Sequence, residues 1–204
     1  MVLKINSIGE AILLFTDLVS LAPLVIFLTL LYNFIILPSK NVLDLVLFIY
    51  LMLAGFIVRF LKDLPYPKSW RWITDRPLGA SNCDYFSRNG LCKPGTPGMP
   101  SGHMTHTTIF AIVMILGRYF SVKGRKINIE NMLFYGVNVA LIVVMAFARY
   151  YKKCHNIPQI IAGFILGSGM GYLFYQLMNM FFLEKNKNKD IIGRAKFLNT
   201  QLYF

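Results

Sequence analysis

The chain has 204 residues, of which 56% are hydrophobic and only 15% charged, and its formal net charge is +12. An ordinary soluble domain carries about 25% charged residues, whereas the apolar residues here fall into blocks of the length that a membrane helix needs. The composition therefore excludes an ordinary soluble protein. Most basic residues flank the apolar blocks, as headgroup contacts and topology signals do. Since no nucleic-acid-binding module is visible, no nucleic acid is expected as a partner.

Five apolar blocks predict an all-α, polytopic transmembrane helix bundle of about five spans. An amphipathic lead-in at residues 8–17 is expected before the first span, which Pro23 could break but whose length favours one helix. The spans are expected at residues 18–37, 42–61, 104–120, 132–148 and 160–183. Residues 62–103 form the only long loop and residues 184–204 a polar tail. We expect one membrane-embedded domain over residues 1–204.

With five spans, the long loop, the start of the third span and the turn between the last two spans lie on one face of the membrane. The short loops and the tail lie on the other face, and most of their charged residues are basic: Lys40, Lys123, Arg125, Lys126, Lys185, Lys187, Lys189, Arg194 and Lys196. The positive-inside rule makes that second face cytosolic. The first face, which carries the motifs described next, is therefore expected to be lumenal or extracytoplasmic.

The segment that opens the third span, Pro100-Ser101-Gly102-His103, has the residues of a phosphate-binding helix start. Pro is favoured in the first turn and Ser as a cap, and a helix N-terminus offers an anion unpaired N–H groups and a partial positive charge. Gly102 allows the backbone to approach a ligand, and His103 can protonate a leaving oxygen. The alternative interpretation is a capped helix start with an interfacial histidine.

A second motif spans the turn between the fourth and fifth spans, where Arg149 ends one apolar block and His155 precedes the next. The planar fork of Arg149 can hold phosphate oxygens. Gln159 follows His155 by four residues, on the same helical face. There it can bond one imidazole nitrogen and leave the other free to attack phosphorus. The alternative interpretation is a basic interfacial turn that anchors the helix.

Together with Arg76-Pro77 in the long loop, these motifs resemble the phosphatidic acid phosphatase type 2 superfamily of membrane lipid phosphatases. The resemblance implies the fold of that superfamily. Members usually show Lys, six residues, then Arg-Pro, but here the residue seven before Arg76 is Ser69, and Lys68 lies one further back. Many members have Asp where this chain has Gln159. The dolichyl diphosphatase and glucose-6-phosphatase branches resemble the chain in having Gln there.

The resemblance implies a role for each of these side chains. His155 would attack phosphorus and form a phosphohistidine, Gln159 would orient it, and His103 would protonate the leaving oxygen and then help to activate water. The phosphate oxygens would be bound by Lys68, Arg76, Ser101, Gly102 and Arg149. This scheme requires no metal and no cofactor.

Cysteines and small residues give further expectations. Cys83 and Cys92 lie nine residues apart in the long loop and can bridge in an oxidising compartment or remain two thiols, while Cys154 is interpreted as a packing residue. His106 is expected to support helix packing rather than bind a metal. Glycines at every fourth position of the last span predict close packing against another span or another subunit, which leaves a homodimer open: Gly163, Gly167 and Gly171.

We therefore expect a membrane phosphatase whose site faces the lumen and whose substrate is a lipid phosphate or a polyprenyl diphosphate held in the bilayer. A soluble sugar phosphate is an alternative substrate. Two alternative functions keep the same fold: a catalytically impaired phospholipid-binding or scaffold protein, and a phosphotransferase that passes the group to an alcohol. A transporter is disfavoured, because the charged residues lie at span ends rather than at the midplane.

Overall fold

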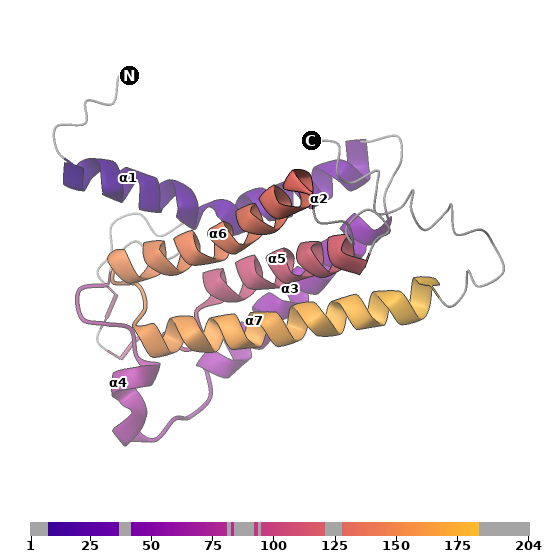
Figure 1. Ribbon diagram of the computed structural model, residues 1–204. Helices are drawn as coiled ribbons and strands as arrows, with labels where there is room; N and C mark the ends of the chain where they lie inside the picture. Colours follow the sequence, from indigo (N-terminus) through magenta and orange to yellow (C-terminus); the bar gives the residue numbers. More distant parts are fainter. Residues whose placement is uncertain are drawn as a thin grey trace.

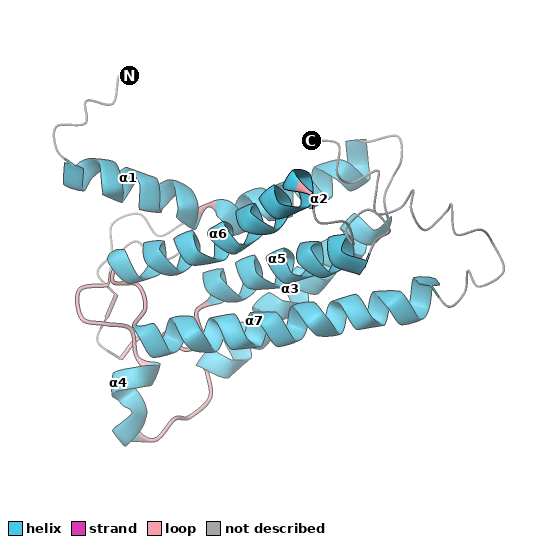
Figure 2. Ribbon diagram, in the orientation of Figure 1, coloured by secondary structure: helices cyan, strands magenta, loops and turns pink. Residues whose placement is uncertain are grey.

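The computed structural model describes residues 8–36, 42–80, 83, 92–93, 95–120 and 128–183. All regular structure within these ranges is helical (Figures 1 and 2). The elements are α1 Ile8–Ser20, α2 Ala22–Ile36, α3 Val42–Lys62, the 3₁₀ turn η1 Lys68–Trp70, α4 Arg71–Thr74, α5 Gly102–Phe120, α6 Ile129–Tyr151, α7 Ile157–Met178 and the π-helical turn η2 Asn179–Leu183. The prediction of an all-α bundle is confirmed.

Four stretches in the described part of the chain are long and apolar enough to cross a membrane: Ile8–Ile36, Val42–Lys62, Ile129–Tyr151 and Ile157–Phe181. They correspond to four of the five expected spans. The remaining expected span, at residues 104–120, is helix α5, whose 19 residues include three buried threonines: Thr105, Thr107 and Thr108. Because α5 is the more polar helix, the expected number of five spans is approximate.

The first apolar block forms two helices rather than one. The lead-in helix α1 runs to Ser20, three residues further than expected, and α2 begins at Ala22. Pro23 is the second residue of α2, where its missing N–H costs no helical hydrogen bond. Figure 1 shows α1 at an angle to α2, so the chain bends just before this proline.

Helix α5 occupies the middle of the bundle, in contact with α7, α6, α3 and α2, and Figure 1 shows it between α6 and α7. The glycines of α7 make this approach close. A Cβ added at Gly163 would lie 2.7 Å from the carbonyl oxygen of Ser101, and one added at Gly167 would lie 2.7 Å from that of Thr105. The glycine stripe therefore packs against a neighbouring helix of the same chain.

His106 of α5 supports packing, as expected. Its Nδ1 lies 2.7 Å from the carbonyl oxygen of Gly102 and its Nε2 lies 3.1 Å from that of Leu51 in α3, and its ring packs against Phe27 of α2. The ring thus joins three helices near the middle of the bundle.

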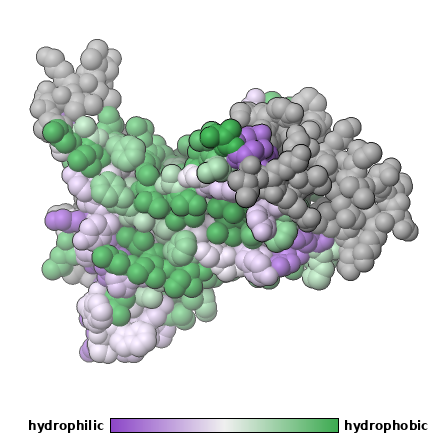
Figure 3. Space-filling model, in the orientation of Figure 1, coloured by the Kyte–Doolittle hydropathy of each residue, from purple (hydrophilic) through white to green (hydrophobic). Residues whose placement is uncertain are grey.

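The outer surface of the described helices is apolar (Figure 3). Large side chains such as Phe56, Phe60, Val137 and Ile165 are each more than 60% exposed, as expected of side chains that face lipid. The basic residues on which the expected topology depends lie at positions 40, 123–126 and 184–204, outside the described residues.

Candidate phosphate site

His155 lies in the turn that joins α6 to α7, and local sequence fixes this turn. Helix α6 ends at Tyr151, and Lys153 adopts a positive φ of 54°. Helix α7 then begins with a capping box. The Asn156 side chain accepts from the N–H of Gln159 at 3.0 Å, and the Gln159 side chain accepts from the N–H of Asn156 at 3.3 Å. His155 therefore stands directly before a fixed helix start, and it is only 2% exposed.

Gln159 fixes the tautomer of His155. Its Nε2 donates to the carbonyl oxygens of Ile73 and Asp75, each at 2.7 Å, and its Oε1 lies 3.0 Å from Nδ1 of His155. Because both amide hydrogens have carbonyl acceptors, the amide oxygen is the group that faces the imidazole, and it can only accept. Neutral His155 therefore carries its proton on Nδ1 and keeps the lone pair of Nε2 free.

Gln159 also brings the three motif segments together. Its side chain holds the segment that leads to Arg76, and its backbone oxygen accepts from the N–H of Ser101 at 3.1 Å. Gly98 lies against the same amide, since a Cβ added there would come within 2.7 Å of Gln159 Oε1 and Nε2. Sequence reasoning gave Gly98 no role, although its place just before the Pro-Ser-Gly-His motif was a signal.

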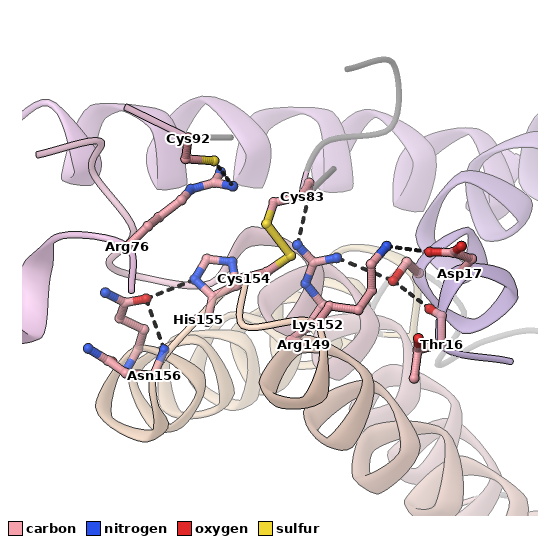
Figure 4. The surroundings of a disulfide bond; sticks show 12 residues. Thr16, Asp17, Arg76, Cys83, Cys92, Arg149, Lys152, Cys154, His155 and Asn156 are labelled. Atoms are coloured by element: carbon pink, nitrogen blue, oxygen red, sulfur yellow. Dashed lines mark hydrogen bonds and ion pairs between the residues drawn. A yellow bond between two sulfur atoms is a disulfide. The ribbon is translucent and has the colours of Figure 1, made fainter. Parts of the chain in front are cut away.

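Arg149 lies near the end of α6 with 1% of its surface exposed. Its Nη2 donates to the carbonyl oxygen of Cys83 at 2.7 Å, and its Nη1 donates to Oγ of Ser20 in α1 at 3.3 Å (Figure 4). The guanidinium is thus held from two sides by segments far apart in the sequence. Neither Cys83 nor Ser20 was predicted to contact the site.

The disulfide of the protein joins Cys83 to Cys154, which are 71 positions apart in sequence and whose Cα atoms are 5.4 Å apart. Cys83 and Cys92 therefore neither bridge to each other nor remain two thiols, so neither alternative that the sequence left open is correct. Cys154 packs in a buried cluster with Ala80 and Cys83, but its disulfide was not predicted. Cys92 is the free cysteine, and its Sγ lies 3.7 Å from Nη1 of Arg76. Figure 4 shows the disulfide between His155 and Arg149, so it ties the long loop to the turn that carries the histidine.

Positive charge surrounds His155. Burial, followed by the charges of Arg149, Lys62 and Arg76, lowers the pKa of this imidazole well below its usual range, while the hydrogen bond to Gln159 acts in the opposite direction. The neutral base is therefore favoured at neutral pH. The three cations that disfavour the imidazolium are equally suited to bind a phosphate beside it.

The two lysines near the first motif have different surroundings. Lys68, which the resemblance implies as a ligand, is exposed on the turn η1. Lys62, the last residue of α3, is half-buried and acts on His155 through its charge. Lys62 also lines a cavity of about 330 Å³ that is bordered by Leu64, Tyr66, Arg71, Thr74, Asp75, Gly95 and Pro97. Lys62 is therefore the lysine that the fold brings to the site.

His103 is the second residue of α5 and is 9% exposed. It follows Ser101 and Gly102. Because the N–H of Ser101 donates to the carbonyl oxygen of Gln159, the start of α5 lies beside the start of α7. The buried hydroxyl of Ser101 finds no hydrogen-bond partner within the described part of the chain. A phosphate oxygen at this helix start would satisfy that hydroxyl together with first-turn N–H groups.

Within the described ranges, no three His, Cys, Asp or Glu side chains gather as a metal ion would require. The site instead consists of two buried histidines, a glutamine that fixes one of them, and several cations at one end of an apolar helical bundle. Such an arrangement can bind a phosphate group and place a histidine beside it.

A sequence model of the PAP2 superfamily matches residues 43–183, more than half of the chain. The chain belongs to the PAP2 superfamily, which confirms the resemblance and supports a phosphatase-type function. No curated protein and no solved structure matches the chain.

Proposed function

We propose that the protein is an integral-membrane phosphatase that hydrolyses a lipid phosphate or a polyprenyl diphosphate through a phosphohistidine at His155. The observation that carries the proposal is the orientation of His155 by Gln159. Nδ1 lies 3.0 Å from the Gln159 amide oxygen, whose position is fixed by the hydrogen bonds of the same amide. Nε2 remains available close to several positively charged side chains. A neutral imidazole with one nitrogen anchored is an activated nucleophile.

The reaction has two steps. In the first, the lone pair of His155 Nε2 forms a bond to phosphorus while the P–O bond to the leaving group breaks, an ester bond in a lipid phosphate and an anhydride bond in a diphosphate. His103 gives the leaving oxygen a proton, which it takes up when the bound phosphate dianion offsets the positive charges around it. In the second, water attacks phosphorus, the P–N bond breaks, and His103 takes a proton from the water, which restores both histidines. His103 thus acts as acid and then as base.

Charge on the phosphoryl oxygens is the main obstacle in both steps, and fixed donors are the main means of overcoming it. Arg149 and Arg76 supply guanidinium groups, and the start of α5 supplies the Ser101 hydroxyl and the N–H of Gly102. A lysine completes the set. We assign this role to Lys62 on its burial and its charge effect on His155, with Lys68 as the alternative that the superfamily pattern implies.

A lipid substrate and an extracytoplasmic site are supported by the position of the site. The reactive groups lie at one end of a bundle with an apolar exterior, where a headgroup can enter while its tail stays in the bilayer. The Cys83–Cys154 disulfide lies at the same end, and disulfides persist in oxidising compartments. In sealed vesicles, an impermeant thiol reagent should therefore reach Cys92 only from the extracytoplasmic side.

The decisive experiment measures phosphate release by the purified protein, in the presence of EDTA, from a polyprenyl diphosphate, phosphatidate and glucose 6-phosphate. Activity should survive EDTA and vanish in His155→Asn, whereas Tyr150→Phe, a change at an exposed neighbour of Arg149, should remain active. Wild type quenched in alkali should carry a phosphoryl group that is stable in base and labile in acid, as a phosphoramidate is. Full activity of His155→Asn would refute the mechanism.

A further inference from the structure

The N-terminal helix α1 reaches the phosphate site although it lies outside residues 43–183, the segment that matches the superfamily. It packs along α6, the helix that carries Arg149. Its last turn contacts the end of α6 through polar side chains, although most residues of α1 are apolar.

The contact is made by Ser20, the last residue of α1. Its hydroxyl donates to the carbonyl oxygen of Thr16 at 2.7 Å and accepts from Nη1 of Arg149 at 3.3 Å. Because the single hydroxyl hydrogen is directed to Thr16, the lone pairs of Oγ are available to the guanidinium. Ser20, Thr16 and Arg149 are all buried, so water does not compete for this bond.

A second polar contact fixes the same end of α1. Asp17 accepts from Nζ of Lys152 at 2.6 Å (Figure 4), and Asp17 is followed by Ser20 after three residues, so both side chains lie on one face of the helix. The opposite side of the Arg149 fork is bound to the carbonyl oxygen of Cys83. The guanidinium is therefore held between α1 and the disulfide-linked loop.

A buried serine that bonds the carbonyl four residues earlier is common in apolar helices and by itself indicates no function. What separates Ser20 from that case is its second partner, a buried guanidinium of the site. We infer that Ser20 is a positioning residue that orients Arg149 toward the phosphoryl oxygens, and that α1 thereby belongs to the phosphate site. The inference rests on the proposed function, because Arg149 is the group through which Ser20 acts.

The test is a double-mutant cycle with Ser20→Ala and Arg149→Lys, read out as kcat, KM and the inhibition constant of orthovanadate. Ser20→Ala should lower kcat/KM and weaken vanadate about tenfold, as expected for the loss of one hydrogen bond to a charged group. In the Arg149→Lys background the same change should have no further effect. Ser20→Thr, which keeps the hydroxyl, should retain activity.

Ser168→Ala is the matched control, since this helical serine of α7 has no hydroxyl partner within the described residues. Losses that simply add in the cycle, or Ser20→Ala with normal vanadate inhibition, would overturn the inference and leave the phosphatase proposal intact. If the wild type releases no phosphate, calorimetric binding of orthovanadate replaces the kinetic readout. In that case the proposed function fails, while the cycle still decides whether Ser20 orients Arg149.

Discussion

Loss of the disulfide should destabilise the protein by several kcal/mol. Cys83 and Cys154 are 71 residues apart, and the chain-entropy model gives about 15 cal/mol/K for closing such a loop, or about 4.4 kcal/mol at 25 °C. In a protein of this length each kcal/mol changes the melting temperature by about 2–4 °C. Cys154→Ala should therefore lower the melting temperature by about 9–18 °C.

The assay is thermal inactivation in detergent, followed by residual phosphatase activity and by the loss of helical circular dichroism. Cys83→Ala should match Cys154→Ala, and the double variant should be no less stable than either, because the three changes remove the same bond. Cys92→Ser is the control and should melt like the wild type, since Cys92 lies outside the disulfide. A dithiol reductant should shift the wild type and Cys92→Ser to the lower temperature and leave Cys83→Ala and Cys154→Ala unchanged.

Two results would refute this reasoning. One is a count of three reactive thiols in the denatured, unreduced wild type, which would show that no bond forms. The other is a melting temperature of Cys154→Ala within about 2 °C of the wild type, which would show that the 71-residue loop is already restrained when the bond is absent.

Three further predictions concern charge, protonation and packing. Lys62→Ala should lower kcat/KM by about a hundredfold or more, whereas Lys68→Ala should change it less than about twofold. The reverse result would make Lys68 the lysine that binds the phosphate. In a ¹³C-histidine NMR titration, the signal that disappears in His155→Asn should titrate well below pH 6.5, because burial and cations lower its pKa in the folded state. The stability that neutral His155 contributes is then present above about pH 6.5, the pKa of histidine in the unfolded chain, and is lost as the pH falls towards the lower pKa of the folded state. A titration midpoint of this signal at or above about pH 6.5 would contradict this. Gly167→Ala should cost about 1–3 kcal/mol of stability in detergent because its Cβ would meet α5. Gly169→Ala, with open space around its Cβ, is the control and should be neutral or slightly stabilising. Equal melting temperatures of the two variants would argue against the close packing of α7 on α5.

Local sequence predicted the helices and the contact between His155 and Gln159. The apolar blocks are long, so their helices follow from length and composition alone. The contact between His155 and Gln159 follows from four-residue spacing on one helical turn, and the structure shows it at 3.0 Å. The packing contact of His106 with the carbonyl oxygen of Gly102 also spans four residues of one helix.

Long-range partners could not be predicted in this way. The partner that the sequence offered for Cys83 was its near neighbour Cys92, but the disulfide joins Cys83 to Cys154, which follows the end of α6. The role of Ser20 depends on the angle between α1 and α6, for which no short motif exists. For Lys62, the sequence gives the helix end but not the course of the following loop, which decides whether the amine faces the site.

The double use of Gln159 limits which residues this position can accept. An aspartate there could still accept from Nδ1 of His155, but it has no hydrogens to give the carbonyl oxygens of Ile73 and Asp75. The carbonyl oxygen of Asp75 would lose this donor at a cost of about 1–3 kcal/mol, whereas that of Ile73 would keep a longer contact, at 3.4 Å, with Nδ2 of Asn156. An acidic side chain at this position would therefore require a different backbone course at residues 73–75, so the glutamine and the path of the segment before Arg76 depend on each other.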